Sequence, residues 1–229
     1  MKNTTSIAPL FAALGLLACS ATSAQEDNTV RVGMYAIFYH AASTDLSGPF
    51  VPPGVKADVG DVQTVYLAYI RRLSARFDLE VAAGVPPKTD TIAKGPAKVG
   101  SVPLNGEVIG TVKWIAPTAL VHYKFLDESA ALRPYVGLGI NFTHFADRQI
   151  NAKGQAALGG PTSASLTNSI GPAATVGLYY HVMNHWSAIA SFSASEVASH
   201  VTLRTEGVVR KTYVSFNPQA LVFAVGYSF

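Results

Sequence analysis

Eight segments of the chain alternate apolar and polar residues with a period of two, and the connections between them alternate long and short. The predicted strands span residues 30–41, 61–71, 76–86, 113–125, 133–145, 170–181, 186–197 and 213–229. The connections are long over 42–60, short over 72–75, long over 87–112, short over 126–132, long over 146–169, short over 182–185 and long over 198–212. Membrane barrels combine short turns on one side with long loops on the other, with both chain ends at the short-turn side. The pattern therefore predicts an all-β fold, an eight-stranded antiparallel up-and-down transmembrane barrel with periplasmic ends.

The two faces of each predicted strand differ in chemistry. In segment 113–125, Ile115 and Val121 share one face, while Trp114, His122 and Lys124 share the other. The first face suits lipid and the second a lumen, and a sheet in hydrocarbon must close to remove its edges. Hydrophobic residues make up 49% of the chain and charged residues only 14%, below the roughly 25% of soluble domains. This balance favours contact with lipid.

The first residues have the pattern of a secretory signal peptide. Lys2 precedes an apolar run over 7–18, and small residues follow up to Ala24. The run is shorter than the roughly 20 residues that a spanning helix requires. We therefore expect a signal peptide over 1–24 and an outer-membrane barrel over 25–229. Lipidation at Cys19, the only cysteine, remains an alternative; without it the mature chain has no thiol for a disulfide or a metal.

The inward-facing residues divide into an apolar group and a charged group. The apolar group lies toward the middle and outside, and is our predicted substrate path: Tyr35, Ile37, Tyr39, Tyr66, Trp114 and Leu120. The charged group lies toward the periplasm: Arg31, Arg76, Asp78, Glu80, Lys124 and Arg133. An eight-stranded barrel encloses little space, and opposite charges inside it must pair because unpaired buried charge is costly. We therefore predict a periplasmic plug of linked ions beneath an apolar vestibule.

Two prolines fall inside predicted strands. Pro117 and Pro172 each lack the amide hydrogen that a strand contributes to the hydrogen-bond ladder. If the plug closes the base, an apolar molecule that enters from outside has to leave through the wall. We therefore predict a lateral opening at Pro117 or Pro172; a proline without function at an edge or bulge is the alternative reading.

Six sequence stretches resemble the OmpW/AlkL family of outer-membrane proteins. They are WIAPT at 114–118, YKF at 123–125, RPYVGLGINF at 133–142, VGL at 176–178, NHW at 184–186 and GYSF at 226–229. The resemblance implies a barrel with an apolar channel that helps small hydrophobic molecules across the membrane and releases them sideways. It further implies surrounding lipid and lipopolysaccharide, and a C-terminal strand ending at Phe229 that the barrel-assembly machinery reads.

Other functions have weaker support in the sequence. Ser193, Ser195, Glu196 and His200 raise the possibility of a lipid hydrolase, but Ser195 and Glu196 point to opposite faces by alternation. His181 and His185 have zinc-like spacing but bracket a short turn rather than lie on a helix. We expect no catalytic residue, metal or cofactor.

The charge distribution leaves one binding alternative. The net charge of +3 lacks the strong basic footprint of a nucleic-acid-binding protein. Lysines in loop 87–112 leave open a surface receptor or adhesin that acts through its extracellular loops. The sequence most favours a passive channel for small hydrophobic molecules.

Overall fold

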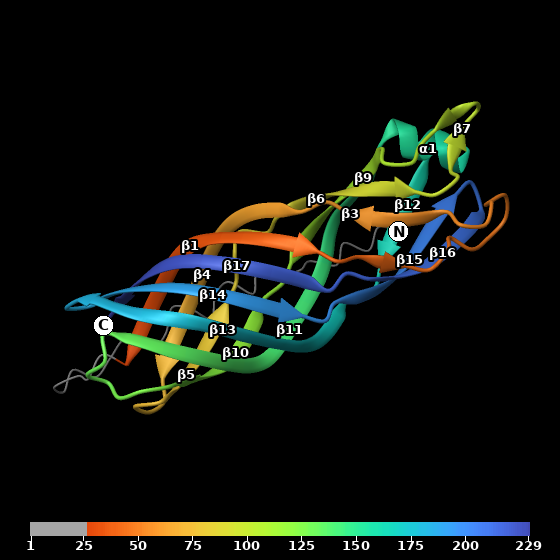
Figure 1. Ribbon diagram of the computed structural model, residues 1–229. Helices are drawn as coiled ribbons and strands as arrows, with labels where there is room; N and C mark the ends of the chain where they lie inside the picture. Colours follow the sequence, from red (N-terminus) through yellow and green to blue (C-terminus); the bar gives the residue numbers. More distant parts are fainter. Residues whose placement is uncertain (1–26) are drawn as a thin grey trace, which may run out of the picture.

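The computed structural model, which describes residues 27–229, contains a closed antiparallel barrel of eight strands (Figure 1). In chain order the barrel strands are β1 (Asn28–Tyr39), β4 (Val62–Arg72), β5 (Phe77–Ala82), β10 (Thr118–Lys124), β11 (Leu132–Ile150), β13 (Ser169–Met183), β14 (Trp186–Ser195) and β17 (Pro218–Ser228). Around the wall they run β10-β5-β4-β1-β17-β14-β13-β11, and β11 pairs back with β10. The predicted fold class is confirmed.

The first and last barrel strands lie side by side. The register between β1 and β17 runs from Thr29 opposite Ser228 to Tyr39 opposite Pro218. At the end of this seam the backbone nitrogen of Phe229 donates to the carbonyl of Asn28 at 2.8 Å. The seam between β1 and β17 is therefore hydrogen-bonded up to the end of the barrel that carries the C-terminus (Figure 1). Strand parity assigns this end to the periplasm.

The outer wall is apolar, as the alternation predicts. On β17, Leu221, Phe223 and Val225 are exposed, whereas Val222 and Ala224 between them are buried inside. The same alternation recurs on β11 and β13, where Leu138, Ile140 and Ile170 are among the most exposed large side chains. A sheet with this outer face contacts acyl chains in a bilayer.

Two inward glycines provide room for aromatic rings in the narrow lumen. A Cβ atom on Gly137 would lie 2.4 Å from Cδ2 of His122, which is its partner across the β10–β11 pair. A Cβ atom on Gly177 would lie 2.7 Å from the hydroxyl of Tyr135 on the neighbouring strand. The glycines of the RPYVGLGINF stretch and its neighbour strand therefore accommodate ring packing inside the barrel.

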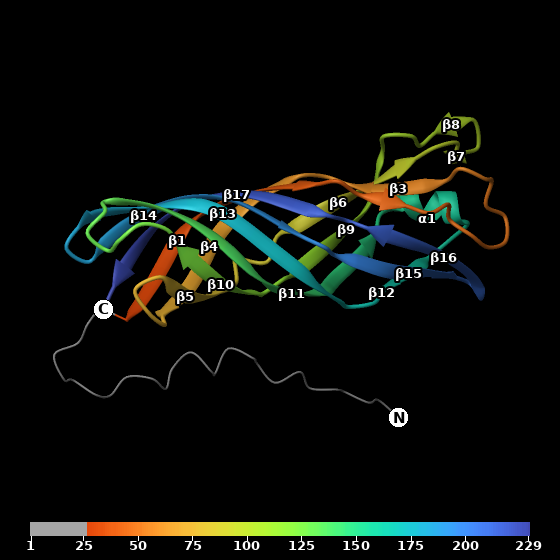
Figure 2. The same cartoon turned by 60° about the horizontal axis from the view of Figure 1, so that its bottom comes forward.

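The long connections are folded and extend the structure beyond the barrel (Figure 2). One side continues the barrel sheet beside the upper half of β11, with strands β9 (Val108–Ile115), β6 (Lys88–Lys94) and β3 (Lys56–Val59). A separate four-stranded sheet has the order β12 (Thr162–Leu166), β15 (Ala198–Thr205), β16 (Val208–Ser215) and β2 (Ala42–Ser43). The remaining elements are the pair β7 (Lys98–Val99) and β8 (Val102–Pro103) and the helix α1 (Ala152–Leu158).

The helix α1 is a single short element with a conventional start. The side chain of Asn151 accepts a hydrogen bond from the backbone nitrogen of Gly154, which caps the first turn. Among residues 27–229, no helix has both the length and the apolarity needed to cross a bilayer.

Two predicted strands cross breaks that alternation does not reveal. The segment 113–125 is divided between β9, which ends at Ile115, and β10, which begins at Thr118. The segment 213–229 is divided between β16, which ends at Ser215, and β17, where Asn217 has a φ of 39° just before the strand. The alternation continues across each break because the side chains on both sides of it point to the same two faces, although the neighbouring strand changes. The predicted signal peptide over 1–24, with Cys19, lies outside the described residues.

Candidate functional site

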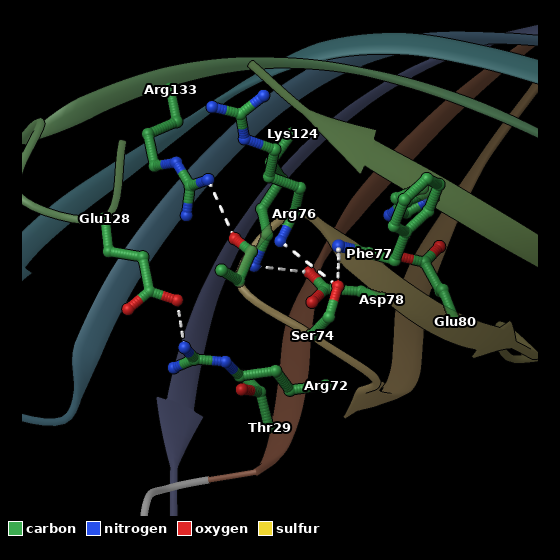
Figure 3. A network of polar contacts seen from close by, with 12 residues as sticks. Thr29, Arg72, Ser74, Arg76, Phe77, Asp78, Glu80, Lys124, Glu128 and Arg133 are labelled. Carbon is green, nitrogen blue, oxygen red and sulfur yellow. Dashed lines mark hydrogen bonds and ion pairs between the residues drawn. The ribbon is translucent and has the colours of Figure 1, made fainter. Parts of the chain in front are cut away.

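A group of buried ionic side chains fills the periplasmic half of the lumen (Figure 3). We call Arg31, Asp78, Glu80, His122 and Lys124 the ionic plug. Arg31 donates from Nη1 to Oε2 of Glu80 at 2.9 Å, and Lys124 Nζ lies 2.9 Å from Oδ2 of Asp78. His122 Nε2 lies 3.9 Å from Glu80 Oε2, beyond hydrogen-bond distance, so it is the two ion pairs that link β1 and β10 to β5.

The ionic plug is tied to its surroundings by neutral donors and acceptors. Tyr66 donates its hydroxyl to Oε1 of Glu80 at 2.8 Å, so both carboxylate oxygens are engaged. Below the plug, Arg133 donates to the backbone carbonyls of Phe125, Ala75 and Leu126 at 3.2, 2.9 and 3.0 Å. Arg133 therefore braces two of the three short turns at this end of the barrel, those before β5 and after β10.

Arg76 is not part of the buried layer, contrary to the sequence prediction. It lies in the turn before β5 with its side chain 53% exposed, and it approaches Asp127 at 3.5 Å and the hydroxyl of Tyr123 at 3.3 Å. The alternation places it one step before Asp78, but the strand begins only at Phe77. Arg76 therefore lies in the turn outside the lumen, and Asp78 is the first inward-facing residue of β5.

Above the ionic plug the lumen is hollow. This lumen hollow has a volume of about 940 Å³ when the space open to solvent is included, and its lining combines aliphatic and aromatic side chains with serines, threonines, Asn141 and Glu80. Tyr35 and Tyr66 meet edge to face at 4.9 Å between ring centroids, and Glu80 lines the hollow at its floor. All six residues of the predicted substrate path lie on its lining: Tyr35, Ile37, Tyr39, Tyr66, Trp114 and Leu120.

An aromatic layer separates the lumen hollow from the extracellular part. We call Tyr39, Trp114, Phe145 and Phe216 the aromatic partition. The Trp114 ring lies 4.8 to 4.9 Å from the ring centroids of the other three. Trp114 is 3% exposed, and its Nε1 donates to Oγ1 of Thr89 at 2.7 Å. Tyr39 and Trp114 were predicted from the sequence but Phe145 and Phe216 were not, although alternation places the latter two on the inward faces of segments 133–145 and 213–229.

A second hollow lies beyond the partition, between the two folded extracellular sheets. This outer chamber has an empty volume of about 1780 Å³ and shares no lining residue with the lumen hollow among residues 27–229. Its walls are mainly apolar, with Leu104, Ile109, Leu166 and Leu203 among them. These stretches were assigned to loops in the sequence analysis, and the chamber was therefore missed. Alternation within 198–205 is a local sign that this stretch forms a strand.

The hydrogen-bond ladder between β5 and β10 is interrupted beside the lumen hollow. Its register ends at Ala82 opposite Thr118, and pairing resumes only where Pro87 accepts from the nitrogen of Trp114 at 2.9 Å. Within the described chain, no backbone hydrogen bond joins 83–86 to 115–117. Residues 83–86 bond to β4 instead, and Gly84 and Ala116 from the two sides of this wall gap line the hollow.

The two predicted prolines differ in their positions. Pro117 lies on the edge of the wall gap, and its carbonyl accepts from the nitrogen of Phe142 on β11 at 2.9 Å. Pro172 faces outward within an unbroken register, opposite Ile140, and its carbonyl accepts from Glu196 at 3.0 Å. The wall is continuous at Pro172 because its missing amide does not interrupt the pairing on either side. The prediction of an opening there is therefore not supported by the geometry.

The residues of the alternative functions do not converge on a reactive site. Ser195 lines the lumen hollow, whereas His200 is exposed and packs on the ring of Tyr213 with centroids 5.0 Å apart. Nucleophile and base must lie within hydrogen-bond reach, and these two face different environments. His185 packs on Tyr227, with ring centroids 5.4 Å apart. In loop 87–112, Lys94 pairs with Asp58 at 3.3 Å.

A closed barrel with an apolar outer wall and a filled periplasmic base defines an outer-membrane β-barrel protein. The sequence profile of the OmpW family matches residues 25–229, and the chain belongs to this family. The resemblance seen in the sequence is thereby confirmed.

Individual relatives show the same relationship. Outer membrane protein W of Vibrio cholerae is 35% identical over 121 residues, which is 53% of this chain and 55% of that protein. The dibenzothiophene metabolism operon protein PahQ of Pseudomonas aeruginosa is 29% identical over 127 residues, 55% of this chain and 56% of that protein. The matches thus span about half the length of these curated relatives.

The fold also matches a solved barrel. The crystal structure of the outer membrane protein OprG from Pseudomonas aeruginosa superposes with a TM-score of 0.79, covering 89% of this chain and 95% of that chain at 22% identity. At this identity the likeness concerns the fold, which includes the extracellular extension as well as the barrel.

Proposed function

We propose that the protein is a passive outer-membrane channel for small hydrophobic molecules that leave sideways through the wall gap. A solute would enter the outer chamber, pass the aromatic partition and reach the lumen hollow. The ionic plug obstructs the way down, whereas the wall gap opens toward lipid. The observation that carries this proposal is the interruption of the β5–β10 ladder directly beside the lumen hollow.

The chemistry of the path fits an apolar solute. Aromatic and aliphatic walls gain free energy when they exclude water with an apolar ligand, and the walls of the outer chamber are mainly apolar. Val85 and Ile115 beside the wall gap are 49% and 40% exposed on the lipid side, so an emerging solute would meet apolar surface throughout. The name of the relative PahQ refers to the metabolism of dibenzothiophene, an apolar aromatic compound, and supports this class of solute.

Filling the wall gap tests the proposed exit. Ala116 lies at the gap and lines the hollow, whereas Ala190 is a half-exposed alanine on β14 that is paired with both neighbouring strands and does not line the hollow. In vesicles with purified protein, we expect Ala116→Trp to reduce uptake of a series of 1-alkanols severalfold and Ala190→Trp to leave it unchanged. Equal uptake by both folded variants would contradict lateral release, and uptake no faster than with an unrelated barrel would contradict the channel.

Pro117 can be tested separately from the wall gap. Alternation of hydrogen-bond direction along β10 places the amide of residue 117 toward Phe142 of β11, not toward β5. Pro117→Val would therefore strengthen the β10–β11 seam and leave the gap present. We expect a smaller decrease in uptake than with Ala116→Trp; unchanged uptake would remove Pro117 from the mechanism.

A further inference from the structure

The outer chamber is apolar but carries charge of only one sign. Four basic residues line it, Lys56, Lys98, Arg148 and Arg210, and no aspartate or glutamate does so among residues 27–229. The first three are exposed, so solvent weakens their charge. Arg210 is different because it is only 5% exposed.

Arg210 is a buried guanidinium whose partners are all neutral. On β16 it lies on the inward face with Thr212 and Val214, and it lines the chamber. Its Nε donates to the carbonyl of Pro49 at 3.1 Å and its Nη1 to Oγ1 of Thr205 at 3.3 Å. Within residues 27–229, no carboxylate lies at salt-bridge distance from it. The Nη2 donors have no protein partner in this region.

A largely buried guanidinium without a counterion, whose Nη2 remains accessible, favours an anion in contact with it. Burial of a charge is costly unless the charge is paired, and the planar guanidinium matches a carboxylate with two parallel hydrogen bonds. The contrast with the barrel is direct: there, buried Arg31 has Glu80 as its partner. The chamber thus offers half of an ion pair within apolar walls.

We infer that the outer chamber binds small amphipathic carboxylates, with the head group against Arg210 and the apolar tail toward the aromatic partition. The inward residues of β16 and its continuation lead from Arg210 through Thr212 and Val214 to Phe216. At about 3.4 Å per residue this row covers about 20 Å, enough for a medium-length alkyl chain. The inference rests on the proposed function in that the chamber belongs to the solute path.

The test compares a charged and an uncharged probe of equal chain length. Octanoate, 1-octanol and inorganic phosphate would be titrated calorimetrically into the full mature protein in phosphatidylcholine nanodiscs, with empty discs subtracted. Arg210→Met removes the buried charge. Lys211→Met is the matched control because it removes an exposed charge from the adjacent position of the same strand.

We expect octanoate to bind about tenfold more tightly than octanol, since charged hydrogen bonds contribute at this scale. Arg210→Met should abolish that difference by weakening octanoate alone, and Lys211→Met should preserve it. Equal affinity for both probes in the wild type, equal loss in both variants, or phosphate binding as tight as octanoate would overturn the inference. If Arg210→Met does not fold, Arg210→Lys and added salt should weaken octanoate and leave octanol unchanged; no such difference would equally overturn it.

The proposed function fails separately from this inference. Octanol uptake in vesicles that does not exceed an unrelated barrel would refute the channel even if octanoate selectivity were found. Normal octanol uptake without octanoate selectivity would refute only the carboxylate site.

Discussion

The periplasmic and extracellular halves of the molecule solve the same packing problem differently. The barrel wall of the periplasmic half is closed, whereas the extracellular extension is built from two separate groups of strands. In the periplasmic half, buried Arg31, Asp78 and Glu80 and the less deeply buried Lys124 occupy the interior as ion pairs. In the extracellular half, two hollows remain, separated only by the aromatic partition.

The difference teaches that paired charges occupy the base of the lumen, whereas a hollow remains above them. Paired charges in a low-dielectric interior hold one another in a fixed arrangement, and removal of one partner leaves the other uncompensated. Apolar walls impose no such pairing and can accept a guest. The proposed solute path, which begins outside and ends in the wall, uses only the second kind of interior.

The largest expected effect is the loss of a plug carboxylate. Glu80→Leu leaves the guanidinium of Arg31 buried without its partner, so we expect the free energy of unfolding to decrease by about 3–5 kcal/mol. Urea unfolding in lipid vesicles, followed by the gel shift between folded and unfolded forms, measures it. The double variant Arg31→Met/Glu80→Leu should recover much of the loss; equal or greater loss in the double variant would contradict the pairing.

A somewhat smaller effect on stability, with an effect on transport, is expected in the extracellular half. Trp114→Ala removes the central ring of the aromatic partition and should destabilise the fold by about 3 kcal/mol, since the ring is buried. It should also accelerate alkanol uptake by joining the two hollows. Trp186→Ala, on the exposed outer wall, is the control for uptake. Uptake that decreases in Trp114→Ala would indicate that the ring guides the solute rather than restricts it.

A single hydrogen bond in the partition gives a finer comparison. Thr89→Val removes the acceptor of the Trp114 indole and leaves the ring in place, so we expect a loss of about 1–2 kcal/mol. In a Trp186→Phe background, in which Trp114 is the remaining tryptophan, we expect its emission maximum to shift and the midpoint of urea unfolding to decrease. An unchanged midpoint would show that the indole finds another acceptor.

The smallest effect is expected at Arg76. Its side chain is exposed in a turn, and surface ion pairs contribute little to stability. Arg76→Ala should leave urea unfolding and alkanol uptake indistinguishable from those of the wild type. A loss comparable with that of Glu80→Leu would place Arg76 in the plug after all.

The barrel and much of the lining of the lumen hollow could be predicted because alternation is a local property. Each inward residue such as Tyr35 or Leu120 follows from its neighbours two positions away, and the lengths of the connections predict the topology. Arg76 was misplaced because alternation does not define where a strand begins. The error concerns the first residue of β5, whereas the alternation of side chains within the strand was predicted correctly.

The outer chamber could not be predicted because its walls depend on pairing between distant segments. β16 pairs with β2 across more than half of the chain, and β12 pairs with β15 rather than with its neighbours in sequence. Arg210 therefore has no local signal that distinguishes it from the exposed Lys211. The wall gap has the same origin, because residues 83–86 remain with β4 while β10 continues beside β11.

The most direct test of the central claim measures alkanol uptake and ion conductance on the same preparation of purified protein. If the hollow opens sideways above a closed base, alkanols should cross faster than with an unrelated barrel, while conductance stays at the level of that barrel. Sustained ion conductance in proportion to the protein, with no preference for apolar solutes, would contradict the account.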